Sequence, residues 1–195
     1  MLYTEALRHE YDLDENSIVF DLGACEGIFI NNIYEKYKCN IYGFEPVPSI
    51  FKKAQKKFAG IEKIKLFNFG LLDRNFETTM KDQGMSSSLF GKPYGGEPVS
   101  IRDINEVLLE FDRIDLFQIN IEGGEYDLLE HLLNNGDVTI LKNIQIQYHT
   151  AKHNRRQNCY TNTKKLIKEI TNKLHKTHNL KWCFPVWESW KIKTK

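Results

Sequence analysis

Apolar runs rich in Ile, Val and Phe alternate along the chain with segments whose apolar residues recur three or four positions apart. Short continuous apolar runs are typical of buried strands, and the wider spacing is typical of amphipathic helices. The runs predict strands at Ser17–Leu22, Asn40–Glu45, Lys63–Phe69, Ile114–Ile121 and Asn143–Tyr148. The helical spacing predicts helices at about Phe29–Lys38, Pro48–Phe58, Ile101–Phe111 and Glu125–Asn134. This alternation predicts an α/β fold with a Rossmann-like, doubly wound and mostly parallel sheet.

Two segments depart from this rhythm. Asp82–Pro98 is rich in Gly, Ser and Pro and predicts a long surface loop, of a length that is usually functional or disordered. Near the end of the chain, a helix is predicted near Thr161–His175, followed by two strands at His178–Phe184 and Val186–Ile192. We expect these two strands to form an antiparallel pair that closes one edge of the sheet.

Composition fits one ordinary domain. The chain has 195 residues, of which 41% are hydrophobic and 27% are charged, so we expect a single domain over residues 1–195. No apolar run approaches the roughly 20 residues of a membrane helix, and we expect a soluble, cytoplasmic protein without a membrane span. The four cysteines form no CxxC pair, which suggests neither a zinc cage nor a disulfide framework.

The net charge of +1 hides an asymmetry, since residues 151–195 carry +10 and the first 150 residues carry −9. This pattern is typical of a solvated basic face on the last helix, although a positive lobe could also steer an acidic or phosphorylated substrate. No nucleic-acid recognition motif accompanies the charge, so nucleic acid is not expected as a partner.

A glycine-containing loop, residues 21–27 (DLGACEG), follows the first predicted strand. In a doubly wound fold this turn lies beside the topological switch point, where ligands bind, and glycines let the backbone approach the ligand. Glu45 stands 24 positions after Asp21, at the end of the second strand, where an acidic side chain accepts hydrogen bonds from ribose hydroxyls. Together these features predict an adenosine-containing ligand. The alternative is that Gly23 and Gly27 only form a tight turn and that Glu45 is a surface charge.

Charge distinguishes between two such ligands. The pyrophosphate of a dinucleotide would be repelled by the carboxylates of Asp21 and Glu26. S-adenosyl-L-methionine has no phosphate, and carboxylates stabilise its ammonium and sulfonium groups, so it is the predicted cofactor. The predicted cofactor-binding residues are Asp21, Gly23, Ala24, Glu26, Gly27, Phe44, Glu45, Pro46, Phe69, Gly70 and Asn120.

Five segments resemble the FkbM-type methyltransferases: Ile18–Phe29, Ile41–Phe51, Ser86–Leu89, Ile114–Glu130 and Ile144–His149. The pairing of FEP after the second strand with EGxE after the fourth is more specific to that family than the glycine loop. The resemblance implies a class I methyltransferase fold. It also implies methylation of hydroxyl oxygens, often on sugars or polyketide-type natural products.

The fourth-strand motif departs from the family pattern. That pattern usually resembles K-x-D-x-E-G-x-E, whereas here Gln118 and Asn120 stand in place of the Lys and the Asp. The EGxE part is kept as Glu122-Gly123-Gly124-Glu125. Because a hard cation needs several oxygen ligands and the Asp is absent, we expect catalysis without a metal.

An aliphatic hydroxyl must lose its proton during methyl transfer, so a base is needed near the acceptor. His149 leaves the end of the fifth strand, on the same rim as Asn120 and Glu122, and is the predicted base, with Glu122 as the alternative. Each also has a structural interpretation, His149 as a strand-end histidine bound to a loop and Glu122 as a charge at a helix N-terminus. His149 and His153 could share a zinc ion on a helix, but no third ligand is evident.

Ser86 and Ser87 on the long loop, and Arg155 after the fifth strand, are predicted to contact the substrate, because loops at this edge form the mouth of such sites. The alternative is that they are solvated loop residues. Four aromatic residues near the end of the chain could stack on a sugar ring or pack in the core: Trp182, Phe184, Trp187 and Trp190.

The sequence therefore predicts an O-methyltransferase whose acceptor is a carbohydrate or another hydroxyl-bearing molecule, such as a glycan or a glycosylated precursor. One alternative is methylation of a small natural product or of a nitrogen atom, because this fold hosts many substrates. Another is an adenosine-ligand binding module without catalysis.

Overall fold

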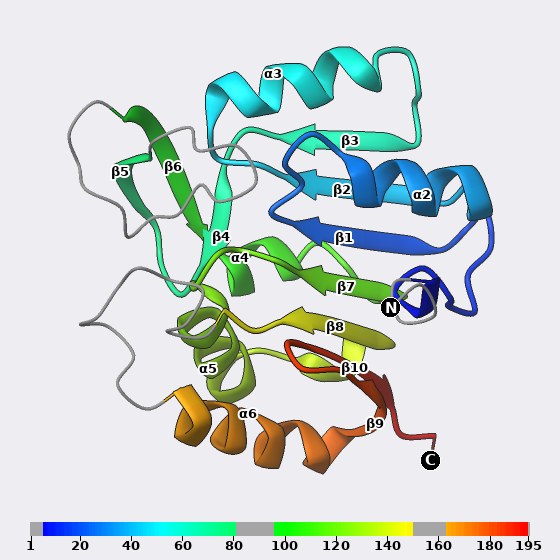
Figure 1. Cartoon of the computed structure of the whole chain (residues 1–195), viewed down its shortest axis with the longest axis vertical. Coiled ribbons are helices and arrows are strands. Elements are labelled where there is room, and N and C mark those ends of the chain that lie inside the picture. The colour runs from blue at the N-terminus through cyan, green and yellow to red at the C-terminus, as the bar shows by residue number, and fades with distance from the viewer. Residues whose placement is uncertain (1–5, 81–95, 150–162, 195) are drawn as a thin grey trace.

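The computed structural model describes residues 6–80, 96–149 and 163–194 (Figure 1). Its centre is a seven-stranded sheet with the order β3-β2-β1-β7-β8-β10-β9, in which five strands run parallel and β10 runs antiparallel to both of its neighbours. The strands of this sheet are β1 (Ile18–Leu22), β2 (Asn40–Phe44), β3 (Ile64–Phe67), β7 (Leu116–Ile119), β8 (Asn143–Gln147), β9 (His178–Cys183) and β10 (Trp187–Ile192).

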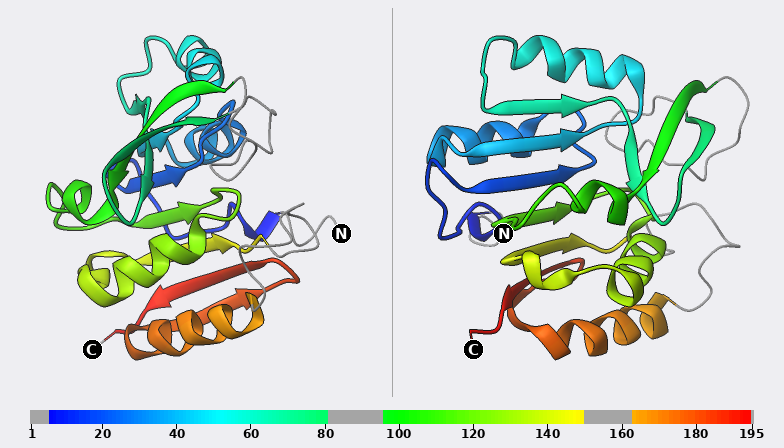
Figure 2. Two further views of the ribbon diagram at one scale, coloured as in Figure 1. Left: turned by 90° about the vertical axis from the view of Figure 1, so that its left-hand side faces the viewer. Right: turned by 180° about the vertical axis from the view of Figure 1, so that it is seen from behind.

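Helices cover both faces of the sheet (Figure 2). They are α2 (Ile28–Tyr37), α3 (Pro48–Lys57), α4 (Ile104–Leu108), α5 (Glu125–Asn135) and α6 (Thr163–Thr177), with a 3₁₀ helix at Val138–Ile140. Alternate residues of β1 point to opposite faces: Phe20 and Leu22 join the buried cluster beneath α5 and α6, while Val19 joins the cluster beneath α2. The predicted doubly wound sheet with an antiparallel C-terminal strand pair is confirmed.

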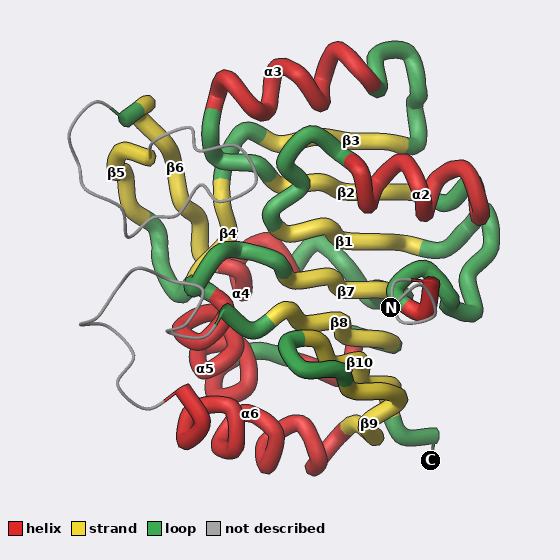
Figure 3. The backbone as a smooth tube through the Cα atoms, in the orientation of Figure 1, coloured by secondary structure: helices red, strands yellow, loops and turns green. Residues whose placement is uncertain are grey.

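A second, three-stranded sheet was not predicted (Figure 3). It has the order β4-β6-β5 and consists of β4 (Gly70–Leu72), β5 (Phe76–Met80) and β6 (Glu97–Asp103). The prediction of a helix from Ile101 was wrong over its first three residues, because β6 extends to Asp103 and α4 begins only at Ile104. Buried Val99 and Ile101 alternate with more exposed neighbours, and this period of two is typical of a strand. The Asp103 carboxylate caps α4 by accepting a 2.8 Å hydrogen bond from the backbone N–H of Asn105.

Residues 6–13, which we term the N-terminal segment, pack against strands of the sheet that are distant from them in the sequence. The Tyr11 hydroxyl donates to Oε1 of Gln145 on β8 at 2.8 Å and lies 3.0 Å from Oγ of Ser189 on β10. This contact places the start of the chain beside the last strands of the sheet. No helix within the described ranges is long and apolar enough to cross a membrane.

Candidate active site

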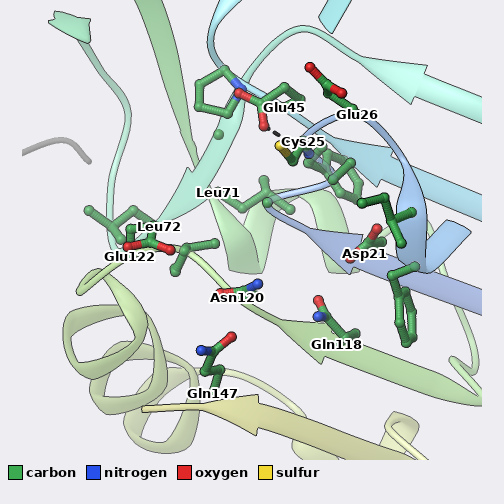
Figure 4. Close-up of a pocket in the computed structure, with 18 of the residues that line it drawn as sticks. Asp21, Cys25, Glu26, Glu45, Leu71, Leu72, Gln118, Asn120, Glu122 and Gln147 are labelled. Atoms are coloured by element: carbon green, nitrogen blue, oxygen red, sulfur yellow. Dashed lines mark hydrogen bonds between the residues drawn. The ribbon is translucent and has the colours of Figure 1, made fainter. Parts of the chain in front are cut away.

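A cavity of about 550 Å³ opens at the carboxyl ends of β1, β2, β7 and β8 (Figure 4). This is the edge where ligands bind in doubly wound sheets. The loop after β1 and the strand ends supply most of its predicted lining, namely Asp21, Gly23, Ala24, Glu26, Phe44, Glu45, Pro46, Gly70, Asn120 and Glu122.

The glycine loop has a shape that only glycine allows at its two Gly positions. Gly23 has a φ of +83°, and a Cβ atom there would stand 2.0 Å from the backbone oxygen of Asn120. The backbone N–H groups of Gly23 and Ala24 both donate to the carbonyl of Phe44 at 3.0 Å, which ties the loop to β2. Gly27 has a φ of +74° and packs against Phe58, so it shapes the start of α2 without lining the cavity.

Glu45 is held at the end of β2 by the backbone around it. Its side chain is 6% exposed, its Oε2 atom accepts from Cys25 N at 3.0 Å, and its Oε1 atom accepts from Val47 N at 2.9 Å. Because two amides fix the carboxylate, its position in the cavity wall is set before any ligand arrives. The remaining lone pairs of such a carboxylate can accept ligand hydroxyls.

Asp21 is a deeply buried carboxylate at the end of β1. It is 1% exposed, and neither of its oxygens has a hydrogen-bond partner among the described residues. Burial raises the pKa of this carboxyl, the positive charge of Arg8 lowers it and the negative charge of Glu45 raises it, with a net pKa of about 7. Ionising a buried carboxylate without hydrogen-bond partners costs free energy. Such a carboxylate in a cavity wall therefore indicates a binding position for a cationic group.

A row of polar side chains continues from Asp21 across the sheet. The strand registers pair Asp21 with Gln118, Gln118 with Gln145, and Gln145 with Ser189. Gln118 Oε1 and Asn120 Oδ1 also have no hydrogen-bond partner among the described residues. The cavity floor therefore presents four buried acceptor oxygens, a set that matches a ligand rich in hydrogen-bond donors or positive charge.

His149 joins two carboxylates at the rim. Its Nε2 atom lies 3.2 Å from Oε1 of Glu122, and its Nδ1 atom lies 3.3 Å from Oε1 of Glu125. Burial lowers the pKa of His149, but hydrogen bonds and charge attraction with Glu122 and Glu125 outweigh burial and raise it to about 9. The imidazole is therefore charged at neutral pH, and it links the two acids.

Only one of the two candidate bases faces the cavity. Glu122 lines it, in a left-handed backbone conformation with a φ of 52°, three positions after the end of β7. His149 is 6% exposed and does not line it. Glu125 is fully buried at the start of α5, where it accepts from the backbone N–H groups of Gly123 at 2.8 Å and His149 at 2.6 Å. The geometry favours Glu122 as the group that meets a substrate.

Not every predicted residue is placed as expected. Glu26 lines the cavity, but its carboxylate is 54% exposed, pairs with Lys53 Nζ at 3.0 Å and lies apart from Asp21 (Figure 4). Phe69 packs among aromatic rings, 5.6 Å from that of Phe44, and does not line the cavity. The predicted substrate residues Ser86, Ser87 and Arg155, together with His153, lie outside the described residues.

Several cavity residues were not predicted as site residues, among them Arg8, His9 and Gln147, and Trp187 was considered only as one of the four C-terminal aromatics. A signal existed for Gln147, since a polar residue at alternate positions of the apolar run IQIQYH indicates a polar patch on one strand face. Arg8 and His9 precede the first strand by ten and nine positions and carried no such signal. Of the other C-terminal aromatics, Trp190 is buried, while Trp182 and Phe184 stack at 4.8 Å.

Comparisons with known proteins place this cavity in context. Residues 21–179 match the family model described as the methyltransferase FkbM domain. The structure resembles the fibrillarin pre-rRNA processing protein of Methanococcus jannaschii, with 15% identity, a TM-score of 0.56, and coverage of 100% of this chain and 76% of that one. It also resembles an rRNA methylase from Streptococcus thermophilus, with 14% identity, a TM-score of 0.54, and coverage of 98% and 95%.

A third similar structure is Aeropyrum pernix fibrillarin with natively bound S-adenosyl-L-methionine, at 10% identity and a TM-score of 0.53, covering 97% of this chain and 73% of that one. At such identities the likeness establishes the class I methyltransferase fold and nothing finer. No curated protein matches this sequence.

Proposed function

Because this chain belongs to the FkbM methyltransferase family, we propose that it methylates a hydroxyl oxygen of a sugar, a glycan or a glycosylated precursor. S-adenosylmethionine is its cofactor. When bound, the cofactor supplies a methyl group that its sulfonium activates toward an oxygen nucleophile. The residues of the chain must then hold the cofactor, hold the acceptor and accept one proton.

The cavity residues fit this cofactor. Asp21 and the amide oxygens of Gln118 and Asn120 are buried acceptors without hydrogen-bond partners among the described residues, and they suit an ammonium group. Glu45 stands at the end of β2, where a fixed carboxylate can accept ribose hydroxyls. The backbone of Gly23 and Ala24 closes the wall between these two positions.

The observation that carries the O-directed reaction is the Glu122–His149–Glu125 arrangement. Glu122 is the one of these three that lines the cavity, and His149 holds it by a contact of 3.2 Å. A carboxylate in this position can accept the proton of an acceptor hydroxyl as the carbon–oxygen bond forms. His149 is protonated at neutral pH, so it acts as a positioning residue that orients Glu122 and balances its charge.

Glu125 completes this arrangement from behind. It is fully buried, and it fixes His149 through contacts to both its Nδ1 atom and its backbone N–H. The buried positive charge of His149 is thereby paired with the buried carboxylate of Glu125 on one side and with the partly exposed carboxylate of Glu122 on the other. The acceptor class, a hydroxyl on a carbohydrate, is supported by the family membership together with this carboxylate.

The test combines product identification with a matched pair of variants. The protein is incubated with methyl-labelled cofactor and a glycan extract of the host, and the labelled product is identified by mass spectrometry. Glu122→Gln should lower the turnover number by roughly 10²–10⁴ while leaving the affinity for S-adenosylhomocysteine unchanged. Glu130→Gln, an exposed change on the same helix as Glu125, is the control and should leave both quantities as they are.

Three outcomes contradict the proposal. Full turnover in Glu122→Gln would move the base elsewhere, and a label on nitrogen or carbon would exclude O-methylation. Tight binding of S-adenosylhomocysteine without transfer to any acceptor would favour a binding module.

A further inference from the structure

The N-terminal segment forms one wall of the cavity and is anchored on two sides. Tyr11 bonds to Gln145 and Ser189 through its hydroxyl, and its backbone N–H donates to the Tyr37 hydroxyl on α2 at 3.0 Å. These contacts reach three elements that are far apart in sequence. Because the segment is fixed in this way, the side chain of Arg8 lines the cavity from a defined position.

Arg8 is stacked on an aromatic ring from the other end of the chain. Its Cζ atom lies 3.6 Å from the centre of the Trp187 ring on β10. Stacking uses the flat face of a guanidinium, and the N–H groups of a guanidinium point outward in its own plane, in the fork geometry that matches a carboxylate. Both residues lie outside residues 21–179, so the family match does not include this pair.

Arg8 and Asp21 face the same cavity with opposite charges. Arg8 is near enough to lower the pKa of Asp21, yet neither oxygen of Asp21 has a hydrogen-bond partner among the described residues. A cation and an anion that share a cavity without a direct hydrogen bond match a ligand with both charges close together. An α-amino acid group is such a ligand, since it carries its ammonium and its carboxylate on one carbon atom.

We propose that Arg8, stacked on Trp187, binds the carboxylate of the cofactor's methionine part, while Asp21 faces its ammonium group. The N-terminal segment thus makes the site selective for ligands with a complete amino acid group. This inference rests on the cofactor site of the proposed function and is independent of the acceptor.

The experiment compares two ligands by calorimetry with the full chain and no acceptor. One ligand is S-adenosylhomocysteine, and the other is its decarboxylated analogue, which keeps the ammonium group and lacks the carboxylate. Wild-type protein should bind S-adenosylhomocysteine tenfold to a hundredfold more tightly, as expected for about 1.4–2.8 kcal/mol from a charge-assisted contact. Arg8→Ala should weaken the binding of S-adenosylhomocysteine by that factor more than it weakens the binding of the analogue, so that both ligands bind about equally.

Two further variants keep the test decisive. Arg8→Lys retains the positive charge but loses the forked pair of donors. It should lose part of the preference for S-adenosylhomocysteine over the analogue, and it serves as the test if Arg8→Ala folds poorly. Arg113→Ala removes an exposed arginine that lies near Asp115, just before β7, and it should keep the full preference.

An equal loss of affinity for both ligands in Arg8→Ala would overturn the proposal, because it would show that Arg8 acts only by keeping Asp21 ionised. Equal affinity of the wild type for both ligands would overturn it as well. If wild-type protein bound neither ligand, the cofactor assignment itself would fail, which separates that outcome from a failure of the Arg8 contact alone.

Discussion

Asp21 and Glu125 are both carboxylates with almost no solvent exposure, at 1% and 0%, yet their surroundings differ. Glu125 accepts hydrogen bonds from two backbone N–H groups and contacts the charged ring of His149. Asp21 has no hydrogen bond from any described residue. One end of the cavity compensates its buried charge internally, and the other end leaves a buried charge for a ligand.

This difference indicates which parts of the site are built before ligand binding. A buried charge with good partners stabilises one arrangement of the side chains, as at the rim around His149. A buried carboxylate without partners costs stability, and a chain tolerates that cost where a cation will bind. The rim is therefore expected to be rigid in the free protein, whereas the Asp21 end should be stabilised most when the cofactor binds.

The largest expected effect is a gain of stability on neutralising Asp21. The folded-state pKa of Asp21 is raised from 3.8 to about 7, so the folded protein holds a proton that the unfolded chain releases, and stability falls as pH rises from about 4 to 7. Asp21→Asn should raise the free energy of unfolding by about 2–4 kcal/mol at pH 8, with a gain that shrinks toward pH 5. Urea denaturation at unit pH steps measures this trend.

His149→Gln should show the opposite sign, and its pH dependence should fall in a higher pH range. The folded-state pKa of His149 is raised from 6.5 to about 9, so its stabilising contribution is complete below about pH 6.5 and is lost as pH rises through 9. The variant should lose about 2–3 kcal/mol at pH 6 and less at pH 9.5. A gain of stability in His149→Gln, or a difference from wild type that changes mainly between pH 4 and 6.5 as for Asp21→Asn, would contradict the contrast between the two ends.

Much of this contrast could not be predicted from the sequence, although the fold could. Strong apolar runs and the FEP and EGGE segments located the main sheet and the positions of Glu45 and Glu122. Whether a carboxylate is partnered depends on side chains brought in by distant strands. Asp21 gains its neighbours through the registers of β1 with β7 and of β7 with β8, which local patterns do not determine.

Two other features depended on packing over long sequence separations. The small sheet was missed because β4 has only three residues and because three polar residues, Glu77 to Thr79, stand in succession within the five residues of β5. The N-terminal segment was missed because its place beside β8 and β10 rests on the Tyr11 contacts, which span more than 130 positions. Single residues outside any periodic element, such as Arg8, carry no local signal of their place in a site.

A smaller effect is expected in cofactor affinity. Asp21 must be ionised to pair with an ammonium group, so the affinity for S-adenosylhomocysteine should rise from pH 6 to pH 8, by up to about tenfold per unit below pH 7. Asp21→Asn should bind about tenfold to a hundredfold more weakly at pH 8 and lose this dependence. Asp112→Asn, an exposed change, is the control for calorimetry. A pH dependence that survives in Asp21→Asn would assign the titration to another group.

The smallest effect is expected at Glu26, which shares the loop with Asp21 and differs from it in exposure. Its carboxylate is 54% exposed and paired with Lys53, where water and salt screen its charge, so Glu26→Gln should change the affinity for S-adenosylhomocysteine by less than about twofold. Calorimetry at low and high salt, with Lys53→Gln beside it, measures this. A loss as large as that of Asp21→Asn would show that Glu26 leaves Lys53 for the ligand. The loop would then supply two carboxylates to the cofactor. The difference in burial between Asp21 and Glu26 would then not determine which of them binds the cofactor.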